Sequence, residues 1–180
     1  MDITVEAGIA AGSFYTYFTS KQDIFAAVLE ELQEEMLHQH VRQIADGDDP
    51  IAIIEASNRG YLKAYLRNAK LMRLLEQVAA IDDNVRELRS SRGRAFVERN
   101  ERSIRELQAR GIADPDLDPL LAATALSAMV GRIAYTTFVV GEKWSLEELV
   151  DTLSRLWVNA LRIPSDGTSR AAKSSRARAS

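Results

Sequence analysis

The chain has 180 residues, no cysteine, a formal net charge of −3, and 46% hydrophobic and 27% charged residues. This composition excludes a disulfide framework and wholesale disorder, and the length allows one or two small domains with a sizeable core. The negative balance, without a long basic stripe in the body of the chain, is unexpected for a nucleic-acid-binding protein.

The first elements predicted are two short helices, at residues 2–8 and 12–18, joined by a tight turn that follows Gly8. Two short helices around a glycine-containing turn are typical of a helix-turn-helix, whose second helix enters the DNA major groove. Small residues at the start of that helix would let the backbone approach the bases, while tyrosine hydroxyls and a lysine would grip phosphates. The alternative is that the aromatic residues only form the core of a helical hairpin. The residues assigned to DNA are Ala11, Gly12, Ser13, Tyr15, Thr16, Tyr17 and Lys21.

The rest of the chain repeats apolar residues with the helical period, and no alternating strand pattern is present, so the sequence predicts an all-α fold. A capping box of Ser145 and Glu148 marks the start of the last helix, and Pro164 its end. The small, polar and basic residues 164–180 predict a disordered tail. The remaining helices are expected at residues 20–44, 50–66, 68–81, 82–111, 119–140 and 145–163.

Residues 120–140 are apolar enough to require a second interpretation, because 21 residues with one charge could span a membrane. Arg132 lies near the middle of this segment, where a charge is costly in a bilayer. A helix buried on all sides in a core and an oligomer interface explains the pattern equally well, and we expect no membrane association.

The string DITVEAGIAAGSFYTYFTSKQDIFAAVLEEL resembles the DNA-binding segment of the TetR family of transcriptional regulators. The resemblance covers 31 of the 180 residues and implies a partial helix-turn-helix domain at 1–30, a helical ligand-binding and dimerisation domain at 31–163, and the tail from 164. It also implies a cytoplasmic homodimer that binds a double-stranded DNA operator and a small-molecule effector, with repression as the expected outcome. The matching elements are Ile3, Ala7-Gly8, Gly12, Ser13, Phe14-Tyr15, Tyr17-Phe18 and Ser20-Lys21.

Family members carry a further helix before this segment, and here the motif follows Met1 almost directly, so the expectation is either a start placed too late or a truncated head that lacks its first helix. Two functions follow. The first is a ligand-responsive DNA-binding regulator, and the alternative is a dimeric small-molecule-binding or interaction protein that has lost DNA binding through the truncation.

The resemblance implies an effector pocket among the helices between residues 50 and 140. Arg92 and Arg99 are seven residues apart on the long helix and would point in roughly the same direction, which favours an anionic effector such as a carboxylate. The alternative is a salt-bridged helix flank, because several glutamates lie near. Arg132 was expected to be buried, with a carboxylate or the effector as its partner. The predicted pocket residues are Asn58, Tyr61, Tyr65, Arg92, Phe96, Arg99 and Arg132.

The last two helices predict a dimer, because a helix that is apolar on every side needs cover from a second copy. The interface on the last helix was assigned to its broad leucine stripe. His38 and His40 have poor spacing for a metal site, and no catalytic pattern stands out, so neither an enzyme nor a cofactor is expected. The interface residues are Leu146, Leu149, Leu153, Leu156 and Trp157.

Overall fold

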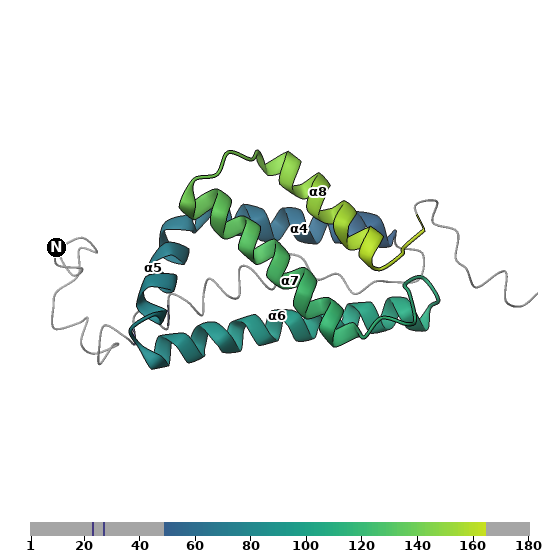
Figure 1. Ribbon diagram of the computed structural model, residues 1–180, viewed down its shortest axis with the longest axis horizontal. Coiled ribbons are helices and arrows are strands. Elements are labelled where there is room, and N and C mark those ends of the chain that lie inside the picture. The colour runs from purple at the N-terminus through teal and green to yellow at the C-terminus, as the bar shows by residue number, and fades with distance from the viewer. Residues whose placement is uncertain (1–22, 24–26, 28–48, 165–180) are drawn as a thin grey trace, which may run out of the picture.

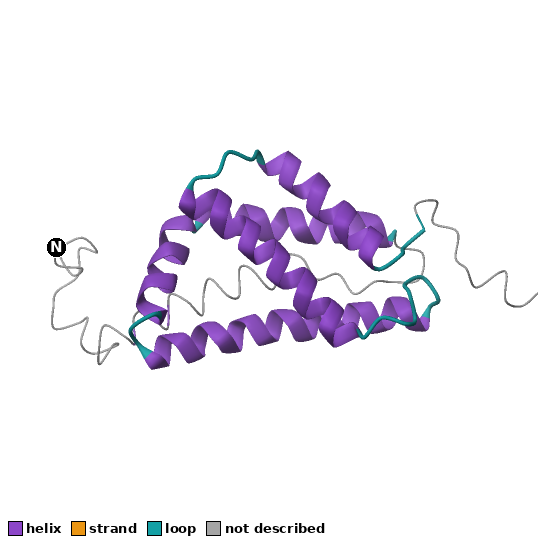
Figure 2. Ribbon diagram, viewed as in Figure 1, coloured by secondary structure: helices purple, strands orange, loops and turns teal. Residues whose placement is uncertain are grey.

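Figure 1 shows the computed structural model of the chain, which describes Asp23, Ala27 and residues 49–164. The residues predicted to contact DNA, from Ala11 to Lys21, lie outside this described part. Every regular element within it is a helix (Figure 2), as the periodicity predicted. The elements are α4 (Pro50–Arg67), α5 (Ala69–Ala79), α6 (Asp83–Ala109), α7 (Pro119–Tyr135), the π-helix η1 (Thr136–Val140) and α8 (Leu146–Ala160).

Aspartates begin three of these helices by accepting hydrogen bonds from backbone N–H groups of the first turn. The Asp82 carboxylate accepts from the N–H groups of Asn84 and Val85, which starts α6. Asp49 and Asp118 cap α4 and α7 in the same way, and each is followed by a proline that suits the first helical position. The boundaries read from the sequence are therefore set by local chemistry.

The capping box of α8 is present as predicted. The Ser145 hydroxyl accepts a hydrogen bond from the Glu148 N–H, and the Glu148 carboxylate accepts one from the Ser145 N–H at 2.8 Å. The other end differs from the prediction, since α8 stops at Ala160 rather than at Pro164. Arg162 has a φ of 53°, a left-handed conformation that ends the helix before the proline is reached.

One further expectation needs correction. The apolar helix does not stay α-helical to residue 140 but becomes the π-helix η1 after Tyr135, where β-branched residues are frequent, and Gly141 closes it with a φ of 102°. Asn68 precedes α5 without capping it through its side chain. Its amide instead donates to the Ala64 carbonyl oxygen at the end of α4.

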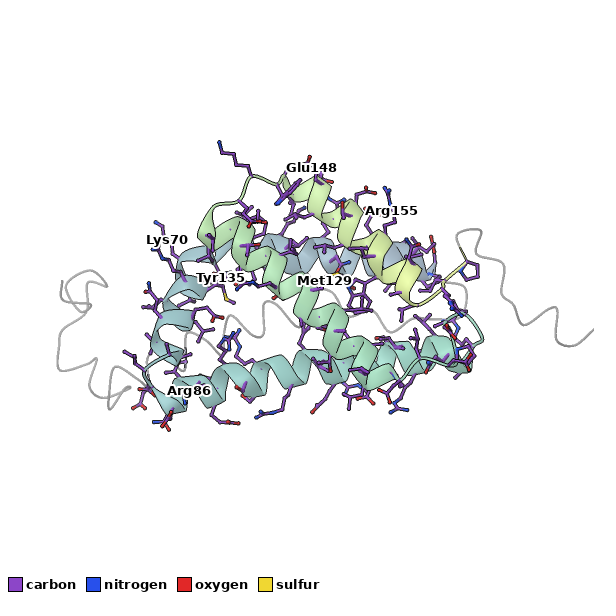
Figure 3. All side chains as sticks on the ribbon, viewed as in Figure 1. Lys70, Arg86, Met129, Tyr135, Glu148 and Arg155 are labelled. Carbon is purple, nitrogen blue, oxygen red and sulfur yellow. The ribbon has the colours of Figure 1, made fainter. Side chains whose placement is uncertain are left out.

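The helices pack as two pairs, α4 with α8 and α6 with α7, and α5 joins the pairs at one end (Figure 1). Charged side chains such as Lys70, Arg86 and Arg155 point outward from this arrangement (Figure 3). The core lies between the pairs and is built from fully buried aliphatic side chains: Leu62, Ile104, Val150 and Leu161.

The leucine stripe of α8 does not form the surface that the sequence suggested. Leu149, Leu153 and Trp157 are 5%, 3% and 8% exposed and are buried in the core of their own chain. The stripe packs against α4, a contact that the periodicity of the sequence does not predict. The assignment of these three residues to a dimer interface is therefore wrong, whereas Leu146 is half-buried and Leu156 is 44% exposed.

The loop between α6 and α7 is fastened to the end of α8. The Asp114 N–H donates to the Leu161 carbonyl oxygen, and the buried Asp114 carboxylate pairs with Arg162 at 2.9 Å. The Gln108 amide donates to the carbonyl oxygens of Asp114 and Leu117 from inside the turn. These contacts hold the two helix pairs together at the end opposite α5.

Helix α7 and η1 together form a segment, Pro119–Val140, that is long and apolar enough to cross a membrane. In the structure this segment packs against α6, α5 and α4. Only part of its apolar surface is buried in the single chain, since Leu121 is 69% and Val140 is 64% exposed.

One buried hydrogen bond links the α4–α8 pair and supplies a test of this packing. The Asn58 side-chain amide donates to the Ser154 hydroxyl oxygen at 3.1 Å. Replacing Asn58 by alanine should lower the free energy of unfolding by about 1–3 kcal/mol, because Ser154 loses its partner in a buried site. Urea unfolding of Asn58→Ala, Ser154→Ala and the double variant measures the coupling, which we expect at about 0.5–3 kcal/mol. Thr152→Ala, on the exposed side of α8, is the control, and strictly additive effects would contradict the predicted coupling.

Candidate ligand-binding site

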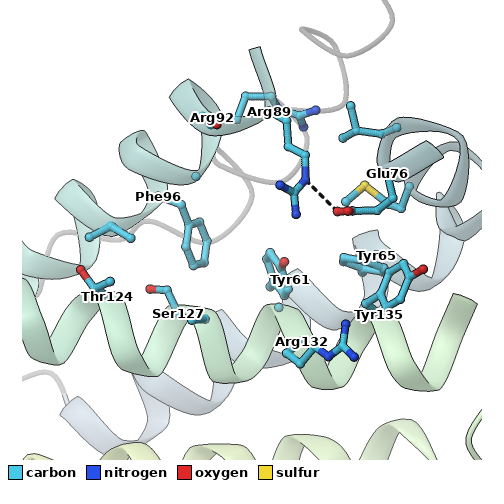
Figure 4. Close-up of a pocket in the computed structure, with 17 residues that line it drawn as sticks. Tyr61, Tyr65, Glu76, Arg89, Arg92, Phe96, Thr124, Ser127, Arg132 and Tyr135 are labelled. Carbon is cyan, nitrogen blue, oxygen red and sulfur yellow. Dashed lines mark hydrogen bonds and ion pairs between the residues drawn. The ribbon is translucent and has the colours of Figure 1, made fainter. Parts of the chain in front are cut away.

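A cavity of about 590 Å³ lies between α4, α5, α6 and α7 (Figure 4). This volume falls within the range of about 300–1,000 Å³ typical of small-molecule sites. Residues of all four helices form its wall, and α5 contributes at the end where it joins the two helix pairs.

Aromatic side chains form much of the wall. Tyr61 and Tyr65 are four residues apart on α4 and therefore share one face of that helix. The Tyr61 ring lies 5.9 Å from that of Tyr65 and 5.1 Å from that of Phe96 on α6, measured between ring centroids. Burial raises the pKa of Tyr61 to about 12 and also raises that of Tyr65, so both phenols keep their protons and remain hydrogen-bond donors.

Of the two arginines that α6 contributes to the cavity wall, one forms an ion pair and the other has a nitrogen without a hydrogen-bond partner among the described residues. Arg89 on α6 donates to the Glu76 carboxylate on α5 at 2.8 Å, and the two charges offset each other. Arg92, one turn further along α6, has a buried Nη1 atom with no hydrogen-bond partner among the described residues. Burial lowers the pKa of the Arg92 guanidinium, although an arginine remains charged at any physiological pH.

Arg132 is the third cation of the cavity wall and comes from α7. Its side chain is exposed in the single chain, and its burial against a carboxylate of a second copy or against the effector stays a prediction. Its guanidinium lies over the ring of Tyr135 on the next turn, 5.6 Å from the centroid, and the ring offsets part of its charge. Arg132 thus lines the cavity from a site that water reaches.

Small residues on α7 make room for the cavity. A Cβ atom added at Gly131 would lie 3.5 Å from the Tyr61 hydroxyl oxygen, an ordinary contact distance. Ser127 and Ala128 also line this side. These small residues of α7 therefore form one wall of the cavity.

A second cavity, of about 70 Å³, lies between α4, α6 and α8 and reaches Val130 on α7. Phe96 belongs to the walls of both cavities. Asn58 and Arg99 line only the smaller one, where the Arg99 guanidinium lies 4.6 Å from the Phe96 ring centroid. Arg92 and Arg99 therefore face different cavities, although they are seven residues apart on one helix.

The predicted pocket residues are thus divided between the two cavities. The larger one brings together Tyr61, Tyr65, Arg92, Phe96 and Arg132, and their role as ligand contacts stays a prediction. The contribution of α5 could not be predicted from the sequence, because it depends on how that helix packs against the two pairs. Its lining residues include Met72, Leu75 and Glu76. Arg89 could have been found, since it lies three residues before Arg92 on the same helix face.

Comparisons with known proteins identify the chain. The family model described as the C-terminal domain of the transcriptional regulator EthR matches residues 54–162, more than half of the chain. The model of bacterial regulatory proteins of the tetR family matches residues 1–28, which include all residues predicted to contact DNA. No curated protein matches the sequence.

Solved structures with this fold include a TetR-family transcriptional regulator from Rhodococcus sp., with a TM-score of 0.75 and 19% identity over 89% of this chain and 85% of that chain. A TetR-family regulator from Syntrophomonas wolfei has a TM-score of 0.72 and 17% identity, over 89% of this chain and 82% of that one. A TetR/AcrR-family regulator from Thermobifida fusca is 28% identical, with a TM-score of 0.60 over 88% of this chain and 84% of that one. With the family matches at both ends, this chain belongs to the TetR family of bacterial transcriptional regulators, ligand-responsive DNA-binding proteins, and carries an EthR-type C-terminal domain.

Proposed function

We propose that the cavity between α4, α5, α6 and α7 is the effector site of this regulator and that the effector is an amphipathic anion, such as a carboxylate with an apolar chain. The volume of about 590 Å³ suits such a molecule, and the aromatic and small side chains of the wall suit its apolar part. Binding of the effector would favour one arrangement of the helical domain and so change the affinity of the regulator for DNA.

The observation that carries this proposal is the unpaired Nη1 of Arg92. A buried guanidinium nitrogen without an acceptor is costly, and a carboxylate placed against it would relieve that cost while forming a charge-assisted hydrogen bond. Arg89 already has Glu76 as its partner, so Arg92 is the better anchor for an anion. Tyr61, whose protonated phenol lines the same cavity, would add a neutral donor.

The effector class is tested with decanoate and its neutral counterpart decanol. Decanoate should bind the wild type more tightly than decanol, and Arg92→Gln should weaken decanoate binding by about tenfold or more, as loss of a charged hydrogen bond predicts. Isothermal titration calorimetry measures both. The control is Arg94→Gln, which removes an exposed arginine of the same helix that pairs with Glu87. Equal affinity for acid and alcohol would contradict an anionic effector.

Two further measurements separate this role from a structural one. Without ligand, Arg92→Gln should unfold at the same or a higher urea concentration, because it removes a cation whose buried Nη1 atom has no acceptor. Gly131→Leu should block decanoate by filling the cavity, whereas Gly131→Ala should leave binding nearly intact, since its Cβ atom fits. Decanoate binding that survives Gly131→Leu would place the ligand elsewhere.

We also propose that Lys21, Tyr15 and Tyr17 position the protein on DNA phosphates and that Ala11, Gly12, Ser13 and Thr16 lie near base edges. The tetR-family match to residues 1–28 supports this assignment.

Lys21→Ala should weaken binding to every duplex and reduce the slope of log affinity against log salt by about one. Fluorescence anisotropy at several salt concentrations measures the slope, and a changed sequence preference with an unchanged slope would argue against the phosphate role.

The regulator is further proposed to act as a cytoplasmic repressor and as a homodimer on a palindromic operator, through the outer sides of α7 and α8. Leu121 on α7 is 69% exposed and Leu156 on α8 is 44% exposed, and both would be covered by a second copy.

Leu156→Arg should yield monomers in sedimentation experiments at low micromolar concentration. Leu74→Arg, at a leucine of α5 that is 45% exposed, should remain dimeric. A wild-type monomer would refute the dimer.

A further inference from the structure

The smaller cavity contains a buried hydrogen-bond donor that the proposed effector contacts do not use. Trp157 on α8 lines this cavity and is 8% exposed, and its indole Nε1 is buried with no hydrogen-bond partner among the described residues. Buried donors are seldom left unpaired, because each one costs free energy that its folded surroundings do not return. The side chain thus combines an unpaired buried N–H group with a place in the wall of an internal cavity.

Other polar groups of the same wall are already engaged. The Asn58 amide donates to Ser154, and the Asn100 amide donates to the Ser127 hydroxyl oxygen at 2.9 Å. The Ser103 hydroxyl donates to the Arg99 carbonyl oxygen at 3.3 Å. Trp157 differs from these groups because its indole N–H has no acceptor among the described residues. A molecule that enters this cavity would therefore gain the most binding free energy if it carried a hydrogen-bond acceptor.

The two cavities are placed to receive one molecule. Phe96 lies in both walls, so a movement of its ring would connect them. Arg92 borders the larger cavity and Asn100 the smaller, eight residues further along α6, which corresponds to about 12 Å of helix. An extended chain covers about 1.2 Å per bond, so on the order of ten bonds span this distance.

We propose that the smaller cavity is the distal end of the effector site and that the indole N–H of Trp157 binds a hydrogen-bond acceptor at the far end of the effector. This inference rests on the proposed anionic effector and narrows it to a molecule with two polar ends, a carboxylate at Arg92 and a carbonyl at Trp157. A volume of about 70 Å³ holds about two water-sized groups, which suits a terminal acetyl group rather than a ring.

The test compares 9-oxodecanoate, which ends in a methyl ketone, with decanoate, which has the same number of carbon atoms and no second acceptor. Calorimetry on the wild type should show about tenfold tighter binding of the keto acid, because the buried N–H gains its missing partner. In Trp157→Phe the ratio of the two affinities should fall to about one. The control is Trp144→Phe, at a tryptophan that is 55% exposed, which should keep the wild-type ratio.

The fluorescence of the Trp144→Phe protein gives a second readout that does not depend on replacing Trp157. The chain has two tryptophans, so Trp157 is then the only one left. Its emission should change more with saturating 9-oxodecanoate than with saturating decanoate.

The outcomes separate the two levels of the proposal. Equal wild-type affinities for the two acids, or a preference for the keto acid that persists in Trp157→Phe, would overturn the role of Trp157 and leave the anionic effector in place. If neither acid binds the wild type, the anionic effector itself fails, and the distal site fails with it.

Discussion

An arginine nitrogen buried without a partner, in the wall of an apolar cavity, is the constraint that gives the helical domain its chemical character. Arg92 lies on α6, in the wall of a cavity to which α5 also contributes, at the end where α5 joins the two helix pairs. A guanidinium in such a place keeps its proton. A buried nitrogen without an acceptor is costly, and an anion is suited to remove that cost.

The surrounding residues would make the proposed site selective. Glu76 and Arg89 pair with each other, and the Arg132 guanidinium lies over the Tyr135 ring on the exposed side. Arg92 is therefore the cation of the wall to which we assign a carboxylate. The aromatic rings of Tyr61, Tyr65 and Phe96 line the same cavity and would strengthen that contact by keeping water from it.

The sequence predicted the helical class, the capping residues and most helix starts, because these depend on groups a few residues apart. The capping box of Ser145 and Glu148 is an example. Prediction from the sequence failed where the burial of a side chain depends on which helix packs against its own. The leucines of α8 form a stripe that fits a dimer interface or an internal partner equally well, and only the position of α4 decides between them. Arg132 has the same ambiguity, since an arginine within an apolar run can still point to solvent.

The candidate site was predicted in part for the same reason. Tyr61 and Tyr65, or Arg92 and Phe96, are four residues apart on one helix, so their common face follows from helical geometry. The separation of Arg92 from Arg99 into two cavities does not follow from it, because Phe96 closes the space between them only in the packed fold. The contribution of α5 and the unpaired indole N–H of Trp157 depend equally on tertiary packing.

A crystal structure of the protein with decanoate tests the central claim most directly. The expected result is an alkyl chain between α4, α5, α6 and α7, with a carboxylate oxygen within about 3 Å of the Arg92 guanidinium. A carboxylate that points to solvent, or a ligand that leaves this cavity empty, would contradict the role assigned to the buried charge.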